Sequence, residues 1–369
     1  MIDWDIHQVA SEGKLKRVQY YLERDGMDAA LNAKDREYGR TPLIAASWFG
    51  HLHVVEYLVE VCGADLNATD NDGRTALLCA SFQRRLSVIQ YLVEKCGADV
   101  NATDNHGRNA LQFVTQYSAC FAVVHYLVQH GSDMNVGGDW GRTPLHWACR
   151  NIDLPVVQCL LEHGANVHVK DDNQQTPLHL ALYCATSDRS NQVRVLQCLV
   201  EHGANANVKD EWGYTPLYFA ICLDFGFDVV QYLVGQGGAY VNAKANDGKT
   251  PLHEACRQGS FPAVQYLMEN GADTNSMDED GKTPLHIAIH HHPYPTLLRT
   301  VQYLVANGSN PSARDNENKT PFQLAQDGGR DDVVNYLQSF CTERFNQRRS
   351  LVLYLVQCGH LGRPEDIED

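Results

Sequence analysis

The sequence of 369 residues contains no stretch that approaches the roughly twenty consecutive apolar residues of a membrane-spanning helix. Met1 leads directly into the acidic residues Asp3 and Asp5, without an apolar leader. We therefore expect a soluble, non-secreted protein of the cytoplasm, with the nucleus as the alternative, and no insertion into membranes.

Positive charge is also scarce in the chain. The 30 Lys and Arg residues are outnumbered by 45 Asp and Glu residues, which gives a formal net charge of −15. A groove dedicated to phosphate groups needs an excess of cations. We therefore expect that nucleic acid is not the partner.

The motifs of catalysis and of cofactor binding are missing as well. Two fragments, Gly248–Thr250 and Gly281–Thr283, resemble the end of a phosphate loop, but Ala243 and Ser276 stand where such a loop needs an earlier glycine. The sequence has no nucleophile elbow, no H-E-x-x-H motif and no C-x-x-C motif. We therefore expect no enzymatic activity and no cofactor.

What the sequence does contain is one phrase that returns nine times, at intervals of 33 to 39 residues. The phrase consists of Thr or Asn, then Pro or Ala, then Leu or Phe. Such a period is typical of a helical solenoid, in which each unit buries its apolar face only against its neighbours. The nine copies begin at Thr41, Thr75, Asn109, Thr143, Thr176, Thr215, Thr250, Thr283 and Thr320.

Each copy predicts a pair of helices. A leading Thr can cap the first free backbone N–H groups, and Pro suits the first helical position because it has no N–H to leave unpaired. In the second helix, Val55, Leu58 and Val59 have helical spacing, and Gly63 stands where a left-handed cap would end the helix. The segment Asp70–Gly73 has the composition of a tight turn. Each unit therefore reads turn, helix, helix, loop.

These features together resemble the ankyrin repeat family, whose pattern is D-x-x-G-x-T-P-L-H followed by G-A-D-x-N. The resemblance implies an all-α fold, a curved and elongated ankyrin repeat solenoid of helix-turn-helix pairs with β-turn fingers, over residues 1–338. We expect an N-terminal cap repeat at 3–34 and nine repeats over about 35–338. The central T-P-L-H signature is complete at Thr143–His146, Thr176–His179, Thr250–His253 and Thr283–His286.

Two repeats and the C-terminal region depart from the pattern. Ala76 and the pair Asn109 and Ala110 replace parts of the Thr-Pro pair, so we expect these helix starts to be less rigid. Residues Ser350–Gly359 echo the second helix of a repeat, and we expect residues 339–358 to form a C-terminal helical cap. Residues 359–369 are expected to be an acidic, disordered tail.

Cysteine and histidine follow the repeat rather than a metal site. Cys159 and Cys198 occupy the same place in successive second helices, as small buried side chains would, so we expect free thiols in a reducing compartment. The histidine of each T-P-L-H signature is expected to bond within the backbone of its own repeat. His286 and His290 lie one helical turn apart, but no Cys or carboxylate of diagnostic spacing accompanies them, so we expect no metal site.

The resemblance also implies where a partner binds, because in this family the turn tips and the exposed face of the first helix recognise proteins. Exposed aromatic and arginine side chains carry much of the binding energy at interfaces. We expect Trp48, Phe49 and Phe82 to point away from the core between repeats. The alternative is that the aromatic residues pack against adjacent turns. The candidate partner-binding residues are Trp48, Phe49, Phe82, Gln83, Gln116, Tyr117, Trp140, Arg150, Tyr183, Trp212 and Tyr214.

A second series of side chains, mostly cationic, lies one residue before each repeat phrase. It could form a track for an acidic peptide, but an Asp-rich turn accompanies most of these positions, so we expect local charge compensation. The series consists of Arg40, Arg74, Arg108, Arg142, Gln175, Tyr214, Lys249, Lys282 and Lys319.

Three functions remain open for such a chain. We expect a non-catalytic scaffold, monomeric when free, that binds a protein or peptide ligand through its concave groove and turn tips. The first alternative is an accessory subunit of a larger assembly, which would dock through the C-terminal helix or through the insertions near residues 185–190 and 291–295. The second alternative is a substrate adaptor of a ubiquitin ligase, which would need a recruitment motif after the repeats, and we see none there.

Overall fold

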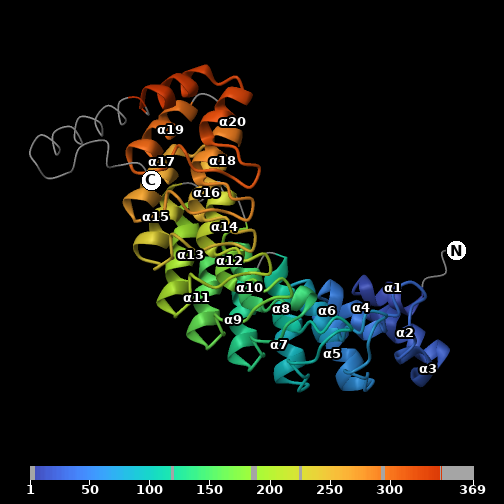
Figure 1. The fold of residues 1–369 in the computed structure, drawn as a ribbon. Helices are drawn as coiled ribbons and strands as arrows, with labels where there is room; N and C mark the ends of the chain where they lie inside the picture. The colour runs from blue at the N-terminus through green and yellow to red at the C-terminus, as the bar shows by residue number, and fades with distance from the viewer. Residues whose placement is uncertain are drawn as a thin grey trace, which may run out of the picture. The chain divides into compact units, whose positions relative to one another are not determined.

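The computed structural model describes residues 5–117, 120–183, 189–223, 227–291, 296–340 and 342. Throughout these ranges the regular elements are helices, and none of these residues forms a strand. The chain divides into two compact units, one ending at Glu211 and the other beginning at Trp212. Figure 1 shows successive pairs of helices in each unit. The predicted all-α repeat fold is confirmed.

In the unit that ends at Glu211, the first helices of consecutive repeats pack against one another in chain order. These helices are α1 (Ile6–Ser11), α4 (Pro42–Phe49), α6 (Ala76–Phe82), α8 (Ala110–Gln116), α10 (Pro144–Arg150) and α12 (Pro177–Leu180). A second row packs beside them and contains α2 (Leu15–Asp25), α5 (Leu52–Glu56), which continues as a π-helical segment (Tyr57–Val61), α7 (Leu86–Glu94), α9 (Phe121–Gln129), α11 (Leu154–Glu162) and α13 (Arg189–Glu201). The short helix α3 (Met27–Leu31) follows α2.

The unit that begins at Trp212 has the same construction. Its first helices are α14 (Pro216–Cys222), α16 (Pro251–Gln258), α18 (Pro284–His291) and α20 (Pro321–Asp327), and each packs against the next. Its second row contains α15 (Phe227–Gly235), α17 (Phe261–Glu269) and α19 (Leu297–Ala306), and residues 331–340 are also helical.

The repeated phrase explains both the start and the core of each first helix. In the first copy, the Thr41 hydroxyl accepts a hydrogen bond from the backbone N–H of Ile44 at 3.3 Å, as an N-cap should. In the first eight copies, the apolar residue two places after the cap is buried between neighbouring helices. This core position holds Leu43, Leu77, Leu111, Leu145, Leu178, Leu217, Leu252 and Leu285.

The signature histidines also form hydrogen bonds to the following repeat, which we did not expect. In His146, Nδ1 accepts a hydrogen bond from the backbone N–H of Thr143 at 3.1 Å, within the same repeat. The opposite ring nitrogen, Nε2, lies 3.1 Å from the carbonyl oxygen of Gln175 in the following repeat. His253 reaches the Lys282 carbonyl oxygen in the same way, at 3.0 Å. These imidazoles therefore join consecutive repeats, which the expectation of bonding within one repeat missed.

The two repeats that depart from the signature still have capped first helices. The Thr75 hydroxyl accepts from the backbone N–H of Leu78 at 3.3 Å. Asn109 and Gln112 form a reciprocal capping box, in which each side chain accepts from the other's backbone N–H at 3.0 Å. The side chains thus supply the cap where proline is missing, and the lower rigidity of these helices stays a prediction.

Backbone hydrogen bonds connect the turns of consecutive repeats. The Asn71 N–H donates to the Tyr38 carbonyl oxygen at 2.9 Å, and the Asn105 N–H donates to the Asp72 carbonyl oxygen at 3.0 Å. In the second unit the Asn246 N–H donates to the Trp212 carbonyl oxygen at 3.0 Å. Each of these turns therefore holds the next through main-chain atoms.

The nine cysteines within the described ranges are free thiols, and burial raises the pKa of Cys79 to about 12. None of the helices in these ranges is long and apolar enough to cross a membrane. Most of the predicted C-terminal cap, the acidic tail and most residues of the two insertions lie outside the described residues.

Candidate functional site

Four aromatic side chains from three neighbouring repeats form a continuous cluster, Trp48, Phe82, Phe113 and Tyr117, which we call the aromatic stripe. Trp48 stacks on Phe82, with ring centroids 5.1 Å apart and 19° between the ring planes. Phe82 also contacts Phe113 at 5.6 Å and Tyr117 at 5.4 Å. Trp48 and Phe82 come from the C-terminal ends of α4 and α6, and Tyr117 follows α8. Equivalent helix ends in consecutive repeats therefore bring the rings together.

The stripe is partly packed and partly open to solvent. Phe113 is buried, Trp48 and Phe82 are half-buried, and Tyr117 is 50% exposed. Phe49, beside Trp48 in the chain, is 44% exposed. The expectation that Phe82 points away from the core between repeats is wrong, because its ring lies among three other aromatic rings. The alternative, in which the aromatic residues pack, holds for the inner side of the stripe, while Phe49 and Tyr117 present aromatic surface.

Arginine side chains flank the stripe. The Arg40 guanidinium lies 4.4 Å from the ring centre of Tyr38 and 4.2 Å from that of Trp48. The Arg108 guanidinium lies 4.6 Å from the ring of Phe113. Cations attract the faces of aromatic rings at these separations. The rings are thus held by both stacking and charge.

Most of the cations before the repeat phrases are compensated, as expected. Arg74 pairs with the buried Asp70 at 2.8 Å, and Arg108 pairs with the buried Asp104 at 2.7 Å. The Asp104 carboxylate also accepts a backbone N–H bond from Arg108 itself at 2.8 Å. Similar pairs with carboxylates involve Arg142, Lys249, Lys282 and Lys319. Among the described residues Arg40 has no such pair, although we expected its charge to be compensated too.

Trp140 stands at the tip of an unusual turn. Its backbone has φ of 56°, in the left-handed region that bulky residues rarely adopt, and Gly141 continues with φ of 66°. The side chain is 59% exposed, lies 5.9 Å from the ring of Trp147, and has the Arg142 guanidinium at 5.4 Å. The turn thus presents a large aromatic surface from a strained backbone.

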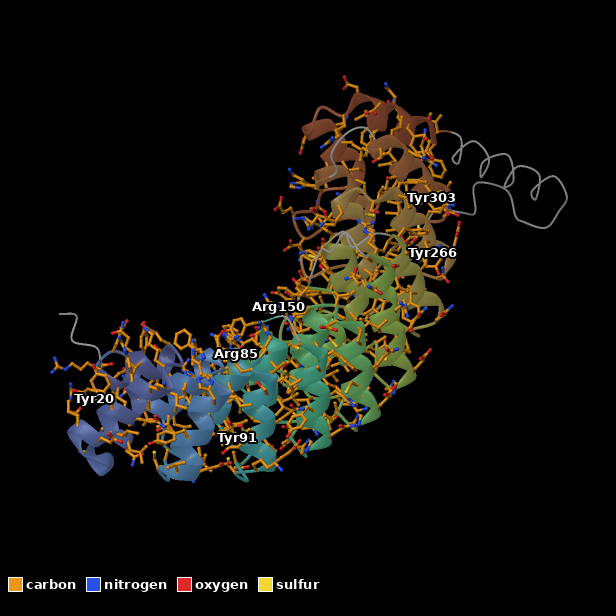
Figure 2. The ribbon with its side chains drawn as sticks, turned by 180° about the vertical axis from the view of Figure 1, so that it is seen from behind. Tyr20, Arg85, Tyr91, Arg150, Tyr266 and Tyr303 are labelled. Atoms are coloured by element: carbon orange, nitrogen blue, oxygen red, sulfur yellow. The ribbon has the colours of Figure 1, made fainter. Side chains whose placement is uncertain are left out.

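The other candidate residues divide between the two units. Gln116 donates weakly to Asp139 at 3.5 Å, Gln83 follows α6, and Tyr183 is 48% exposed. Arg150 lies over the ring of Trp147 at 5.6 Å. Figure 2 shows Arg150 and Arg85 along one edge of the first unit and Tyr91 at the opposite edge.

Trp212 and Tyr214 belong to the second unit and form a separate aromatic cluster. Their ring centroids are 6.5 Å apart, and Tyr214 stacks on Tyr218 at 4.4 Å. The structure therefore joins Trp48, Phe82 and Tyr117 directly and places Phe49 next to them in the chain. It gives Trp212 and Tyr214 a cluster of their own.

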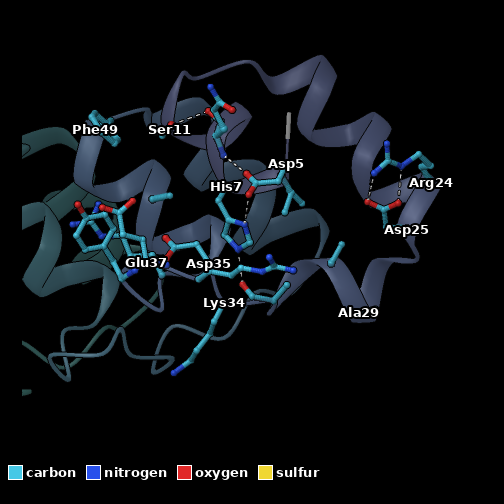
Figure 3. A pocket seen from close by; sticks show the side chains of 18 residues that line it. Asp5, His7, Ser11, Arg24, Asp25, Ala29, Lys34, Asp35, Glu37 and Phe49 are labelled. Atoms are coloured by element: carbon cyan, nitrogen blue, oxygen red, sulfur yellow. Dashed lines mark hydrogen bonds and ion pairs between the residues drawn. The ribbon is translucent and has the colours of Figure 1, made fainter. Parts of the chain in front are cut away.

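A cleft of about 940 Å³ opens at the N-terminal end of the first unit. Its walls come from α1, the end of α2, α3, the first turn and α4, and they include Tyr38, Arg40 and Phe49. Figure 3 shows Phe49 at one side and the Arg24–Asp25 ion pair at the other. Sequence reasoning missed the cleft because the N-terminal repeat has no preceding turn, so its helices were interpreted only as a cap.

These surfaces offer aromatic faces, guanidinium groups and backbone-held carboxylates. Within the part of the chain that the structure describes, no three His, Cys, Asp or Glu side chains are grouped in a way that suits a metal ion. Burial lowers the pKa of the His146 imidazole to about 4 and fixes it as a structural, neutral group.

Comparisons with known proteins agree with this architecture. A family model described as "Ankyrin repeats (3 copies)" matches residues 6–104, 111–196, 171–245, 227–315 and 270–349. The chain therefore belongs to the ankyrin repeat family, whose members bind protein partners and are generally non-catalytic.

Two curated relatives show a local similarity to the chain. It is 40% identical over 62 residues to Protein fem-1 homolog A of Danio rerio and 39% identical over 66 residues to Protein fem-1 homolog A of Homo sapiens. These matches cover 16% and 17% of this chain. The chain spans 10% of the length of each of these relatives.

Proposed function

We propose that the chain is a non-catalytic recognition module that binds a protein or peptide through the aromatic stripe and the exposed side chain of Phe49. The observation that carries this proposal is the combination of packed and exposed aromatic residues in consecutive repeats. Phe49 and Tyr117 are each close to half exposed; Tyr117 contacts the Phe82 ring, and Phe49 follows Trp48 in the chain.

Such a surface is suited to binding because it is already ordered. The stack of Trp48 on Phe82 and the contact of Phe82 with Tyr117 restrict the side-chain rotamers before a partner arrives. Ordering a side chain at an interface costs about 0.5–1.5 kcal/mol, and a pre-ordered surface avoids much of that loss. Aromatic and arginine side chains are also enriched among residues whose truncation weakens binding most.

The test uses peptides that are selected from a random display library for binding to the intact chain. We expect their affinity, measured by fluorescence anisotropy, to fall by about 2 kcal/mol in Phe49→Ala or Tyr117→Ala, because these are the exposed rings of the surface. Tyr20→Ala is the matched control, since Tyr20 is 58% exposed on α2 and does not line the cleft. Circular dichroism checks that each variant is folded.

The two alternative functions predict the opposite result. Peptides or partners that bind the Phe49→Ala, Tyr117→Ala double variant unchanged, but no longer bind a chain truncated after residue 338, would refute the groove proposal. That outcome would favour an accessory subunit or an adaptor that docks through the C-terminal region.

A further inference from the structure

The first turn of the array is one residue longer than most of the turns that follow. Asp70 and Arg74 are four residues apart, as are Asp104 and Arg108, whereas Arg40 follows Asp35 by five. In the shorter turns, one carboxylate oxygen accepts backbone N–H groups and the other pairs with the arginine four residues later. The insertion therefore shifts Arg40 out of the position in which its own turn would neutralise it.

The Asp35 carboxylate uses its hydrogen-bonding capacity on the longer turn. One of its oxygens accepts from the backbone N–H groups of Glu37, Tyr38 and Gly39, at 3.1, 2.6 and 3.0 Å. The Arg40 guanidinium lies instead between the rings of Tyr38 and Trp48. Its carboxylate partner has been replaced by two aromatic faces.

The Arg40 guanidinium is left with unused donors. Its Nε atom is enclosed and has no hydrogen-bond partner within the described residues, and the guanidinium pairs with no carboxylate there. Arg74, Arg108 and Arg142 each lie on a buried aspartate. The buried Nε is out of reach of a ligand, but Arg40 lines the cleft, and a carboxylate is the acceptor that matches the planar fork of a guanidinium. Arg40 thus lacks the anion that these three arginines have.

The surrounding cleft has room for that anion, and its own acids are already engaged. Arg24 holds Asp25 at 2.6 Å, and Asp5 accepts from the backbone N–H of Gln8 at 2.8 Å. The neighbouring Glu37 carboxylate raises the pKa of Tyr38. The exposed cations that also line the cleft are Lys34 and Arg36. The lining holds four Asp and Glu and four Lys and Arg side chains, so it carries no net charge. What an incoming carboxylate meets there is the Arg40 guanidinium, which pairs with no carboxylate among the described residues.

We propose that Arg40 anchors a carboxylate of a peptide bound in this cleft, supplied by an Asp or Glu side chain or by a free C-terminus. The two rings fix the plane of the guanidinium, so a carboxylate can approach its free edge with both oxygens. An apolar side chain next to the carboxylate then lies against Phe49, which lines the same cleft. This inference rests on the proposed recognition function and adds the chemistry of the ligand.

A synthetic array of random heptapeptides tests the anchor. Each peptide is printed in pairs that differ only in Glu against Gln or Asp against Asn, and each pair is printed with a free or an amidated C-terminus. For the intact wild-type chain we expect the acidic or free-acid member to bind about tenfold more tightly, as charge-assisted hydrogen bonds imply. Dependence on the side chain or on the terminus identifies the source of the carboxylate.

Two variants that each remove one positive charge distinguish a specific role of Arg40 from general electrostatic attraction. Arg40→Gln is expected to abolish the preference for the acidic member, whereas Arg36→Gln, which removes an exposed cation from the same cleft, should retain it. Arg40→Lys keeps the charge but not the planar fork, and should recover only part of the preference. Equal binding of both members by the wild-type chain, or an acid preference that persists in Arg40→Gln, would overturn the proposal.

The two proposals fail in different ways. Peptides that depend on Phe49 and Tyr117 but show no acid preference would leave the aromatic surface standing and remove the Arg40 anchor. An acid preference that depends on Arg40 but not on those rings would support the anchor alone. An array with no bound peptide would refute both.

Discussion

Truncation of Phe82 separates the structural and recognition roles of the aromatic stripe. Phe82→Ala removes a half-buried ring that contacts Trp48, Phe113 and Tyr117. A fully buried Phe→Ala change costs about 3–5 kcal/mol, and half of that burial suggests about 2 kcal/mol. That range already contains the contacts the ring makes with its neighbours, so we expect a loss of about 2 kcal/mol in local stability.

Hydrogen exchange read by mass spectrometry is the assay suited to a repeat array, because local opening need not coincide with global unfolding. Amides of α4, α6 and α8 should exchange faster in Phe82→Ala. Those of α10 should change less, because the ring partners of Phe82 are Trp48, Phe113 and Tyr117, which precede that helix.

The matched comparison is Phe49→Ala. Phe49 lies one repeat before Phe82, and its side chain is 44% exposed. We expect it to cost less than about 1 kcal/mol, in line with ordinary surface substitutions. If Phe82→Ala changed exchange no more than Phe49→Ala does, the ring contacts would carry little stability. The interpretation of the stripe as a packed support for exposed rings would then be refuted.

Three further predictions follow from other sites. The folded-state pKa of His146 is about 4, against an ordinary value of about 6.5. Its contribution to the free energy of unfolding is therefore complete above pH 6.5 and falls by about 3 kcal/mol as the pH drops to 4. His146→Gln, which can form the capping box seen at Asn109, should make the stability less dependent on pH in this range, as measured by denaturation at a series of pH values. Arg108→Gln should destabilise the first unit by about 3 kcal/mol in urea titrations, because it leaves the buried Asp104 charge without its partner. Lys282→Gln, whose carboxylate partner is exposed, should cost less than about 1 kcal/mol. Equal losses in the two variants would contradict this reasoning. Trp140→Asn should keep stability within about 0.5 kcal/mol, since relief of the left-handed strain offsets lost contacts, and a large change in melting temperature would show otherwise.

The sequence predicts the repeat, the helix starts and the core well because each depends on local rules. Thr41 caps its helix and Leu43 is buried, as the spacing of the phrase requires. The reach of His146 to the Gln175 carbonyl oxygen is different, since it depends on how far one repeat lies from the next. A period in the sequence gives the order of the repeats but not that distance.

The candidate site was predicted less completely, for two physical reasons. Phe82 lies at a helix end, where a small rotation decides between the groove and the neighbouring repeat, and spacing alone does not resolve that rotation. Arg40 resembles the other arginines in position, but one inserted residue in its turn removes its partner. The insertion is visible in the sequence and would have been the signal to look for.

The hydrogen bonds between consecutive turns limit the ways in which this surface can bind a partner. The Asn71 N–H and the Tyr38 carbonyl oxygen already hydrogen-bond to each other. A ligand in an extended conformation therefore cannot use this pair for main-chain hydrogen bonds of its own. Discrimination must then come from side chains such as Phe49 and Tyr117, which are exposed and contribute little to the core. A scaffold organised in this way can change its choice of ligand by surface substitutions while the backbone that supports them stays the same.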